Sequence, residues 1–186
     1  TSYKKDYFLS VYIQEYLDQF SHIYTPYFIG NKSKENTIPF LPWMINSNHG
    51  KSYYSNHIRD INYFLNLKHL SKPKKISVIC SNKVKTENQH LRYMFVKELK
   101  NHFGNKLDWF GNGINYISTK WDGISNYKYH IAIENNFQQN IISEKLYDAY
   151  LGLSFPLYAG AENVYDYFPK KSLEKINIFD LENSIS

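Results

Sequence analysis

The sequence lacks most of the features by which several large protein classes are recognised. One cysteine, Cys80, in 186 residues excludes an internal disulfide and is typical of a reducing compartment. No apolar run approaches the roughly 20 residues that span a bilayer, and no secretory signal sequence is visible. We therefore expect a cytoplasmic protein. Because the net charge is +5, we also expect a peripheral association with the anionic inner face of a bacterial membrane.

The motifs of several enzyme classes are also absent. There is no D-x-D, the metal–nucleotide clamp of one large glycosyltransferase class, and no G-x-S-x-G nucleophile motif. None of the seven histidines pairs with another His or Cys at zinc-ligand spacing. "HGKS" (49–52) ends like a phosphate-binding P-loop, but Ile45 stands where that loop needs its first Gly. The sequence thus predicts neither a metal site nor a required cofactor.

The positive charge points to an anionic partner, which could be a nucleotide, a membrane surface or a nucleic acid. Nucleic acid is the weakest of the three, because no recognised nucleic-acid-binding module accompanies the charge. The densest basic run, "SKPKK" (71–75), is typical of a solvated linker. We expect no nucleic-acid partner.

From about residue 71, strand-like and helix-like stretches alternate regularly. The expected strands cover 76–80, 107–110, 129–133, 155–158 and 176–179, and the expected helices cover 88–103, 143–151 and 162–168. Repeated units of this length predict an α/β domain with a Rossmann-like parallel sheet covered on both faces. Cys80 lies in the apolar run "ISVIC", where a buried, inert thiol is expected.

The first 70 residues are less regular. Helices are expected at 12–20 and 56–65, and a strand within "YTPYFIG" (24–30). We therefore divide the chain into a partial N-terminal region, 1–70, and a C-terminal Rossmann-like nucleotide-sugar-binding domain, 71–186.

The stretch "IAIENNFQQNIISEKLYDAY" (131–150) joins an expected strand to an expected helix. Ser143 is a natural N-cap, and Glu144 in the first turn suits the helix dipole. The positive charge of Lys145 in the same turn is unfavourable with that dipole, at a cost of a few tenths of a kcal/mol, about 0.3, in stability. Two interpretations follow. Lys145 is either solvated or paired with Glu144, or it binds an anion such as a diphosphate at the helix N-terminus.

This stretch belongs to a longer pattern that resembles the signature of the α-1,3-fucosyltransferases, glycosyltransferase family 10. The matching residues fall in the family's order: Glu134-Asn135, Glu144-Lys145, Ala149, Pro156, Gly160, Phe168 and Pro169. Upstream, "ICSNKVKTENQHLRYMFVKEL" resembles the family's strand, S-N pair and arginine-bearing helix, with Ser81, Asn82 and Arg92 in place. "LDWFGNG", with Asp108 and Gly111, and the closing "LEKINIFD" extend the resemblance over about residues 75–180.

The resemblance implies a GT-B type glycosyltransferase, in which two Rossmann-like domains face a cleft and the C-terminal one holds GDP-fucose. It implies that Arg92 and Lys145 contact the diphosphate and stabilise charge on the leaving group. Glu144 would bind the ribose and Asn135 would line the donor pocket beside the Ser143 cap. Glu134 is either a pocket residue or a strand-end carboxylate that holds the loop.

The implied reaction is inverting transfer of fucose to a hydroxyl of a glycan acceptor, such as lipopolysaccharide or another cell-surface glycan. Such transfer needs a base on the acceptor side. In this sequence Ser33 lies near the family's glutamate position and Glu35 is the nearest acid, so Glu35 is our base candidate. The alternative is a non-catalytic GDP-sugar- or glycan-binding relative that has lost this base.

Overall fold

The computed structural model describes residues 18–19, 21, 23–24, 33–34, 43–47, 59–180 and 184. The chain divides into two compact units, Thr1–Pro39 and Phe40–Ser186. In the first unit, the short strands β1 (Ile23–Tyr24) and β2 (Ser33–Lys34) pair in parallel. The second unit thus begins well before residue 71. The assignment of acceptor and donor sides to the two parts stays a prediction.

Several N-terminal predictions cannot be placed. The helix expected at 12–20, most of the strand expected at 24–30, and the base candidate Glu35 lie outside the described residues.

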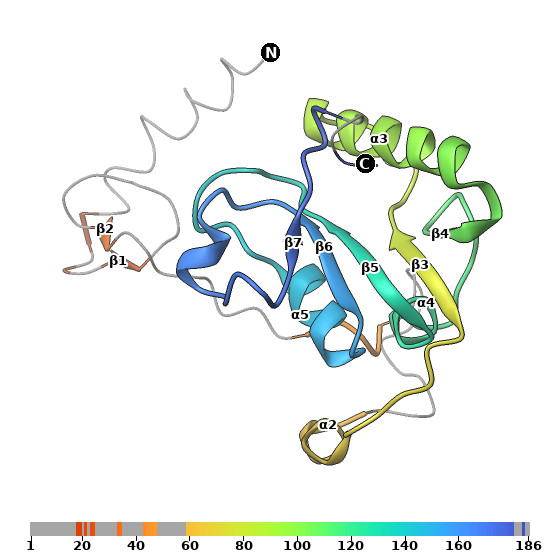
Figure 1. The fold of residues 1–186 in the computed structure, drawn as a ribbon. Helices are drawn as coiled ribbons and strands as arrows, with labels where there is room; N and C mark the ends of the chain where they lie inside the picture. The colour runs from red at the N-terminus through yellow and green to blue at the C-terminus, as the bar shows by residue number, and fades with distance from the viewer. Residues whose placement is uncertain are drawn as a thin grey trace. The chain divides into compact units, whose positions relative to one another are not determined.

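The second unit is built on a parallel five-stranded sheet (Figure 1). Its strands are β3 (Lys74–Ile79), β4 (Leu107–Phe110), β5 (Tyr127–Ile133), β6 (Phe155–Ala159) and β7 (Glu174–Lys175). Their order is β4-β3-β5-β6-β7, and every neighbouring pair is parallel. The predicted α/β fold class is confirmed. From β3 the sheet is extended to one side by β4 and to the other side by β5, so the strand order reverses between β3 and β5, and ligands bind at such a switch point of an open sheet.

Helices cover both faces of the sheet, as predicted. α3 (Glu87–Phe103) lies over one face, and α4 (Lys120–Ile124) and α5 (Glu144–Leu151) lie over the other (Figure 1). The alternation of β5 explains this, since Ile131 and Ile133 join the core beneath α3 while the intervening residues face the opposite side. None of the helices in the described part of the chain is both long and apolar enough to cross a bilayer.

The remaining elements differ in detail from the expected ones. The last strand is not 176–179 but β7, because Asn177 closes a turn by accepting a hydrogen bond from the Phe179 amide at 3.0 Å. The helix expected at 162–168 is a 3₁₀ turn, η2 (Val164–Asp166), and a further 3₁₀ turn, η1 (Gly104–Lys106), follows α3. Ahead of the sheet, α2 (Ile61–Asn66) begins after its cap Asp60, within the helix expected at 56–65, and residues 56–58 lie outside the described residues.

The carboxyl end of β3 is packed closely against the turn that follows β4. Cys80 donates its amide to Phe110 O at 2.8 Å, and Gly111 follows at φ +148°. A Cβ at Gly111 would lie 2.4 Å from Cys80 O, so only glycine permits this approach. Cys80 is buried, as predicted, and burial raises the pKa of its thiol. The close approach fixes the loop that leaves β3.

The "SKPKK" segment is mostly exposed, as its composition suggested, but Lys72 is partly buried. Lys72 Nζ donates to Ser125 O at 2.7 Å and also to Gly152 O. These carbonyls end α4 and α5, where the helix dipoles favour a cation. Burial lowers the pKa of Lys72 to about 8. Lys72 therefore ties the carboxyl ends of two neighbouring helices together.

Replacing Lys72 by Met is expected to lower the free energy of unfolding by about 1–3 kcal/mol, because the buried carbonyls of Ser125 and Gly152 lose a charged donor. Lys75→Met, at an exposed neighbouring position, is the matched control and is expected to have little effect. Urea unfolding followed by circular dichroism measures both. Equal stability of the two variants would contradict the role assigned to Lys72.

Candidate nucleotide-binding site

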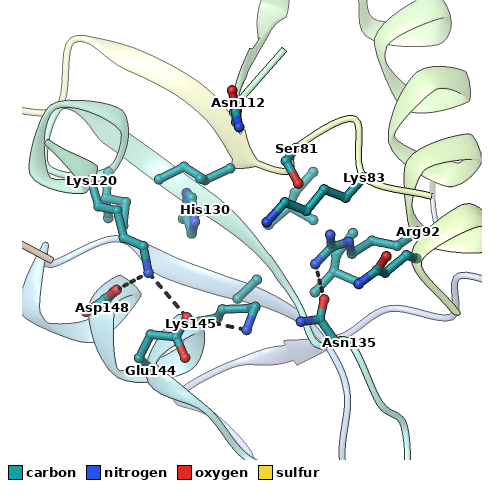
Figure 2. Close-up of a pocket in the computed structure, with 16 residues that line it drawn as sticks. Ser81, Lys83, Arg92, Asn112, Lys120, His130, Asn135, Glu144, Lys145 and Asp148 are labelled. Atoms are coloured by element: carbon teal, nitrogen blue, oxygen red, sulfur yellow. Dashed lines mark hydrogen bonds and ion pairs between the residues drawn. The ribbon is translucent and has the colours of Figure 1, made fainter. Parts of the chain in front are cut away.

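A cavity of about 380 Å³ opens at the switch point of the sheet, beside the ends of β3 and β5 (Figure 2). Its walls come from the ends of β3 and β5, from the loops after β3 and β4, and from α3, α4 and α5. Six charged side chains line it: Lys83, Arg92, Lys120, Glu144, Lys145 and Asp148. The fold alone thus brings together residues that lie up to 65 positions apart.

Arg92 supplies a buried guanidinium to one wall of the cavity. It is 7% exposed, and it donates through Nη1 to Asn135 Oδ1, which lies just beyond the end of β5 (Figure 2). Among the described residues, none provides a hydrogen-bond partner for its buried Nε. A buried arginine whose polar atoms are only partly satisfied fits an anion site, since an unpaired buried donor is unfavourable.

Glu134 does not line the cavity but supports it from beneath. Its carboxylate is 1% exposed and accepts the Ser143 amide at 2.8 Å and the Ser143 hydroxyl at 2.5 Å. It also pairs with Lys145 Nζ at 3.3 Å. Of the two roles considered for Glu134, the structure shows the strand-end carboxylate that holds the loop.

Space around Glu134 is limited by the start of the next loop. A Cβ at Gly160 would lie 2.5 Å from Glu134 Cγ and 2.2 Å from the Tyr158 hydroxyl. That hydroxyl accepts the Ala161 amide at 3.1 Å, and burial raises its pKa. Glycine at 160 therefore lets the loop after β6 pack against the support of the cavity.

Lys145 and Glu144 open helix α5 at the cavity wall. Ser143 caps the helix as predicted, accepting the Lys145 amide at 3.4 Å. Lys145 Nζ contacts Ser143 Oγ at 2.8 Å and Glu144 Oε1 at 3.4 Å. Burial alone would raise the pKa of Glu144, but Lys145 and Lys120 lower it to about 2. The pairing expected between Lys145 and Glu144 is present, and both side chains still face the cavity.

Sequence reasoning missed a second ion pair at this wall. Lys120 Nζ lies 3.3 Å from Glu144 Oε1 and 3.0 Å from Asp148 Oδ2 (Figure 2). Two signals could have found it. Thr119 and Asp122 form a capping box that starts α4, and Glu144 and Asp148 are four residues apart on one helix face.

The same network includes a segment that precedes the sheet. Asp148 Oδ1 accepts the Met44 amide at 2.8 Å, and Asp148 is 1% exposed. The first amides of α4 donate to Ser47 O and Ile45 O, both at 2.9 Å. Residues 43–47 thus satisfy groups at the start of α4 and on α5, and hold the wall in place.

His130 lies at the base of the cavity and was also missed. It is 3% exposed, and its Nδ1 lies 2.8 Å from Ser77 Oγ on β3. Burial, with Lys120 and Lys72 nearby, lowers the pKa of His130 to about 3. The imidazole is therefore neutral at physiological pH and adds no charge to the cavity.

The structure brings Arg92, Asn135, Glu144 and Lys145 together around one cavity and places Glu134 and Ser143 directly beneath it. A helix N-terminus, two predicted phosphate ligands and a carboxylate at the switch point of a parallel sheet are the parts of a nucleotide site. This fold and this cavity are therefore typical of α/β domains of the nucleotide-binding class.

Comparison with known proteins supports a narrower assignment. The sequence model described as "Glycosyltransferase family 10 (fucosyltransferase) C-term" matches residues 69–185. This chain belongs to glycosyltransferase family 10, and the matched part is the family's C-terminal region. The resemblance inferred from the sequence is confirmed.

Individual relatives agree with this assignment. The mouse 4-galactosyl-N-acetylglucosaminide 3-alpha-L-fucosyltransferase 9 is 27% identical over 121 residues, which are 61% of this chain and 33% of the relative. An Arabidopsis thaliana alpha-(1,4)-fucosyltransferase is 42% identical over 50 residues, 27% of this chain and 12% of the relative.

Solved structures show the same fold. An alpha1,3-fucosyltransferase crystallised with GDP matches with a TM-score of 0.51 and 25% identity, over 61% of this chain and 33% of that one. Another, with GDP-fucose, matches with a TM-score of 0.50 and 24% identity over the same shares. The chain therefore spans about a third of the length of these fucosyltransferases.

The buried His130 makes the stability depend on pH. The imidazole titrates near 6.5 in an unfolded chain and near 3 in the fold, so between these values the unfolded chain binds more protons. The free energy of unfolding is expected to fall by about 1.4 kcal/mol for each pH unit below 6.5 through this group alone. Comparing the chain with His130→Gln by urea unfolding at pH 7, 6 and 5 isolates this contribution.

The His130→Gln variant is expected to lose less stability than the unsubstituted chain between pH 7 and pH 5. NMR of the imidazole provides a second measurement that does not depend on the variant. An imidazole that titrates near 6.5 in the folded chain would contradict the buried, neutral state.

Proposed function

We propose that this domain binds the GDP-fucose donor of a fucosyltransferase. The observation that carries the proposal is the meeting of Arg92, Lys145, Glu144 and Asn135 around one cavity at the switch point of the sheet. Family membership and the GDP bound in a related alpha1,3-fucosyltransferase support guanosine diphosphate as the ligand.

In the proposed complex, Arg92 and Lys145 face the diphosphate. Both are held by neighbouring groups before the donor arrives, Arg92 by Asn135 and Lys145 by Ser143 and Glu134. Preorganised cations stabilise charge that develops on a leaving group without a further cost of reorganisation. The carboxylate of Glu144, which stays ionised because its pKa is about 2, is available to accept hydrogen bonds from the ribose hydroxyls.

The proposed reaction is inverting transfer. An acceptor hydroxyl attacks the anomeric carbon of fucose, the bond from that carbon to the GDP oxygen breaks, and a base takes the hydroxyl proton. Glu35 is the base candidate from the sequence. The proposed acceptor is a glycan of lipopolysaccharide or another cell-surface glycan. We also propose that the chain is cytoplasmic. Its net charge of +5 favours association with an anionic membrane surface.

GDP binding is the direct test. A ligand at 100 times its dissociation constant stabilises its protein by about 2.7 kcal/mol, so GDP is expected to raise the thermal midpoint of the intact chain. Lys145→Ala is expected to abolish most of this shift, whereas Lys97→Ala, at an exposed position of α3, leaves it unchanged. Each variant is compared with its own midpoint without GDP. A chain that is folded and shows no shift with GDP would disprove the proposal.

Turnover separates a transferase from a non-catalytic relative. We expect release of GDP from GDP-fucose in the presence of an N-acetyllactosamine-type acceptor, and its loss in Glu35→Gln with GDP binding retained. Binding without turnover in the unsubstituted chain would instead support the non-catalytic alternative. Full turnover by Glu35→Gln would exclude Glu35 as the base.

A further inference from the structure

The charges around the cavity nearly cancel. Arg92, Lys120 and Lys145 are three cations, and they are balanced by three carboxylates that support or line the same wall: Glu134, Glu144 and Asp148. His130 is neutral because its pKa is about 3. These groups alone give a cavity with no net charge, and such a cavity attracts a diphosphate only weakly at a distance.

Lys83 changes this balance. It is exposed, it lines the cavity, and its amine points into the space between His130 and Arg92 (Figure 2). Within residues 59–180, no carboxylate or carbonyl pairs with its ammonium, unlike those of Lys120 and Lys145. Lys83 therefore adds one positive charge that the carboxylates of the cavity wall do not balance.

The loop that carries Lys83 is anchored on both sides of it. Before it, the Asn82 amide donates to Asn112 O at 3.1 Å, and a Cβ at Gly113 would lie 2.2 Å from Asn82 Nδ2. After it, the Lys85 amide donates to Gln89 Oε1 at 3.0 Å. The backbone at Lys83 is thus held over the cavity while its amine remains available.

We propose that Lys83 binds the phosphate groups of the nucleotide and makes the site prefer a nucleoside diphosphate to a monophosphate. This inference rests on the proposed nucleotide site but adds a residue that is not among the matching residues named for the family pattern. A diphosphate carries more negative charge than a monophosphate, so it gains more from an exposed cation that no carboxylate within residues 59–180 neutralises.

The test compares the dissociation constants of GDP and GMP for the intact chain and three variants by isothermal titration calorimetry. Lys83→Gln is expected to weaken GDP binding by about tenfold, the effect of one charged hydrogen bond, and to weaken GMP binding less. Lys83→Arg, which keeps the charge, is expected to restore most of the affinity. Lys85→Gln is the matched control, because it removes the same charge two positions away and outside the cavity. It is expected to bind GDP like the unsubstituted chain.

Each outcome supports or overturns a defined statement. GDP affinity in Lys83→Gln that equals the affinity in Lys85→Gln would overturn the inference and leave the proposed donor site standing. An equal loss for GDP and GMP would overturn the preference for a diphosphate. Binding of UDP in place of GDP, with the same dependence on Lys83, would support the inference and contradict the proposed donor. No binding of any nucleotide by the unsubstituted chain would overturn both.

Discussion

The arrangement of the cavity depends on the contacts that the buried carboxylate of Glu134 makes. Glu134 directly follows β5. Its carboxylate accepts hydrogen bonds from the amide and the hydroxyl of Ser143 and forms an ion pair with Lys145. A buried carboxylate is strongly unfavourable unless it is paired and hydrogen-bonded, so these contacts offset the cost of burying Glu134. Gly160 leaves room for this packing. One side chain therefore sets the position of the strand end, the following loop and the start of α5.

Charge compensation explains how so many ionised groups gather in one place before a ligand binds. Lys120 bridges Glu144 and Asp148, and Asp148 also accepts the Met44 amide. Burial raises the pKa of Asp148, and Lys120 acts against that rise. The charges of this wall therefore nearly cancel, whereas no carboxylate within residues 59–180 pairs with Lys83 on the opposite loop. A site with fixed, paired groups on one side and an available cation on the other suits an anionic ligand that enters and leaves.

The wall of the cavity depends on a segment that lies well before the sheet in the sequence. Residues 43–47 precede the sheet in sequence and yet complete the amino end of α4. Through Asp148 and Lys120 they connect to Glu144, the predicted ribose ligand.

The sequence by itself determined the alternation of strands and helices, the Ser143 cap, the burial of Cys80 and the family, because these depend on local periodicity and on motif order. It could not reveal that Lys120 pairs with Asp148, or that Met44 donates to a carboxylate 104 positions away. Such partners are chosen by the order of strands in the sheet and by the packing of helices on its faces. Only the tertiary structure decided them, because a short sequence window contains no information about what lies across the sheet.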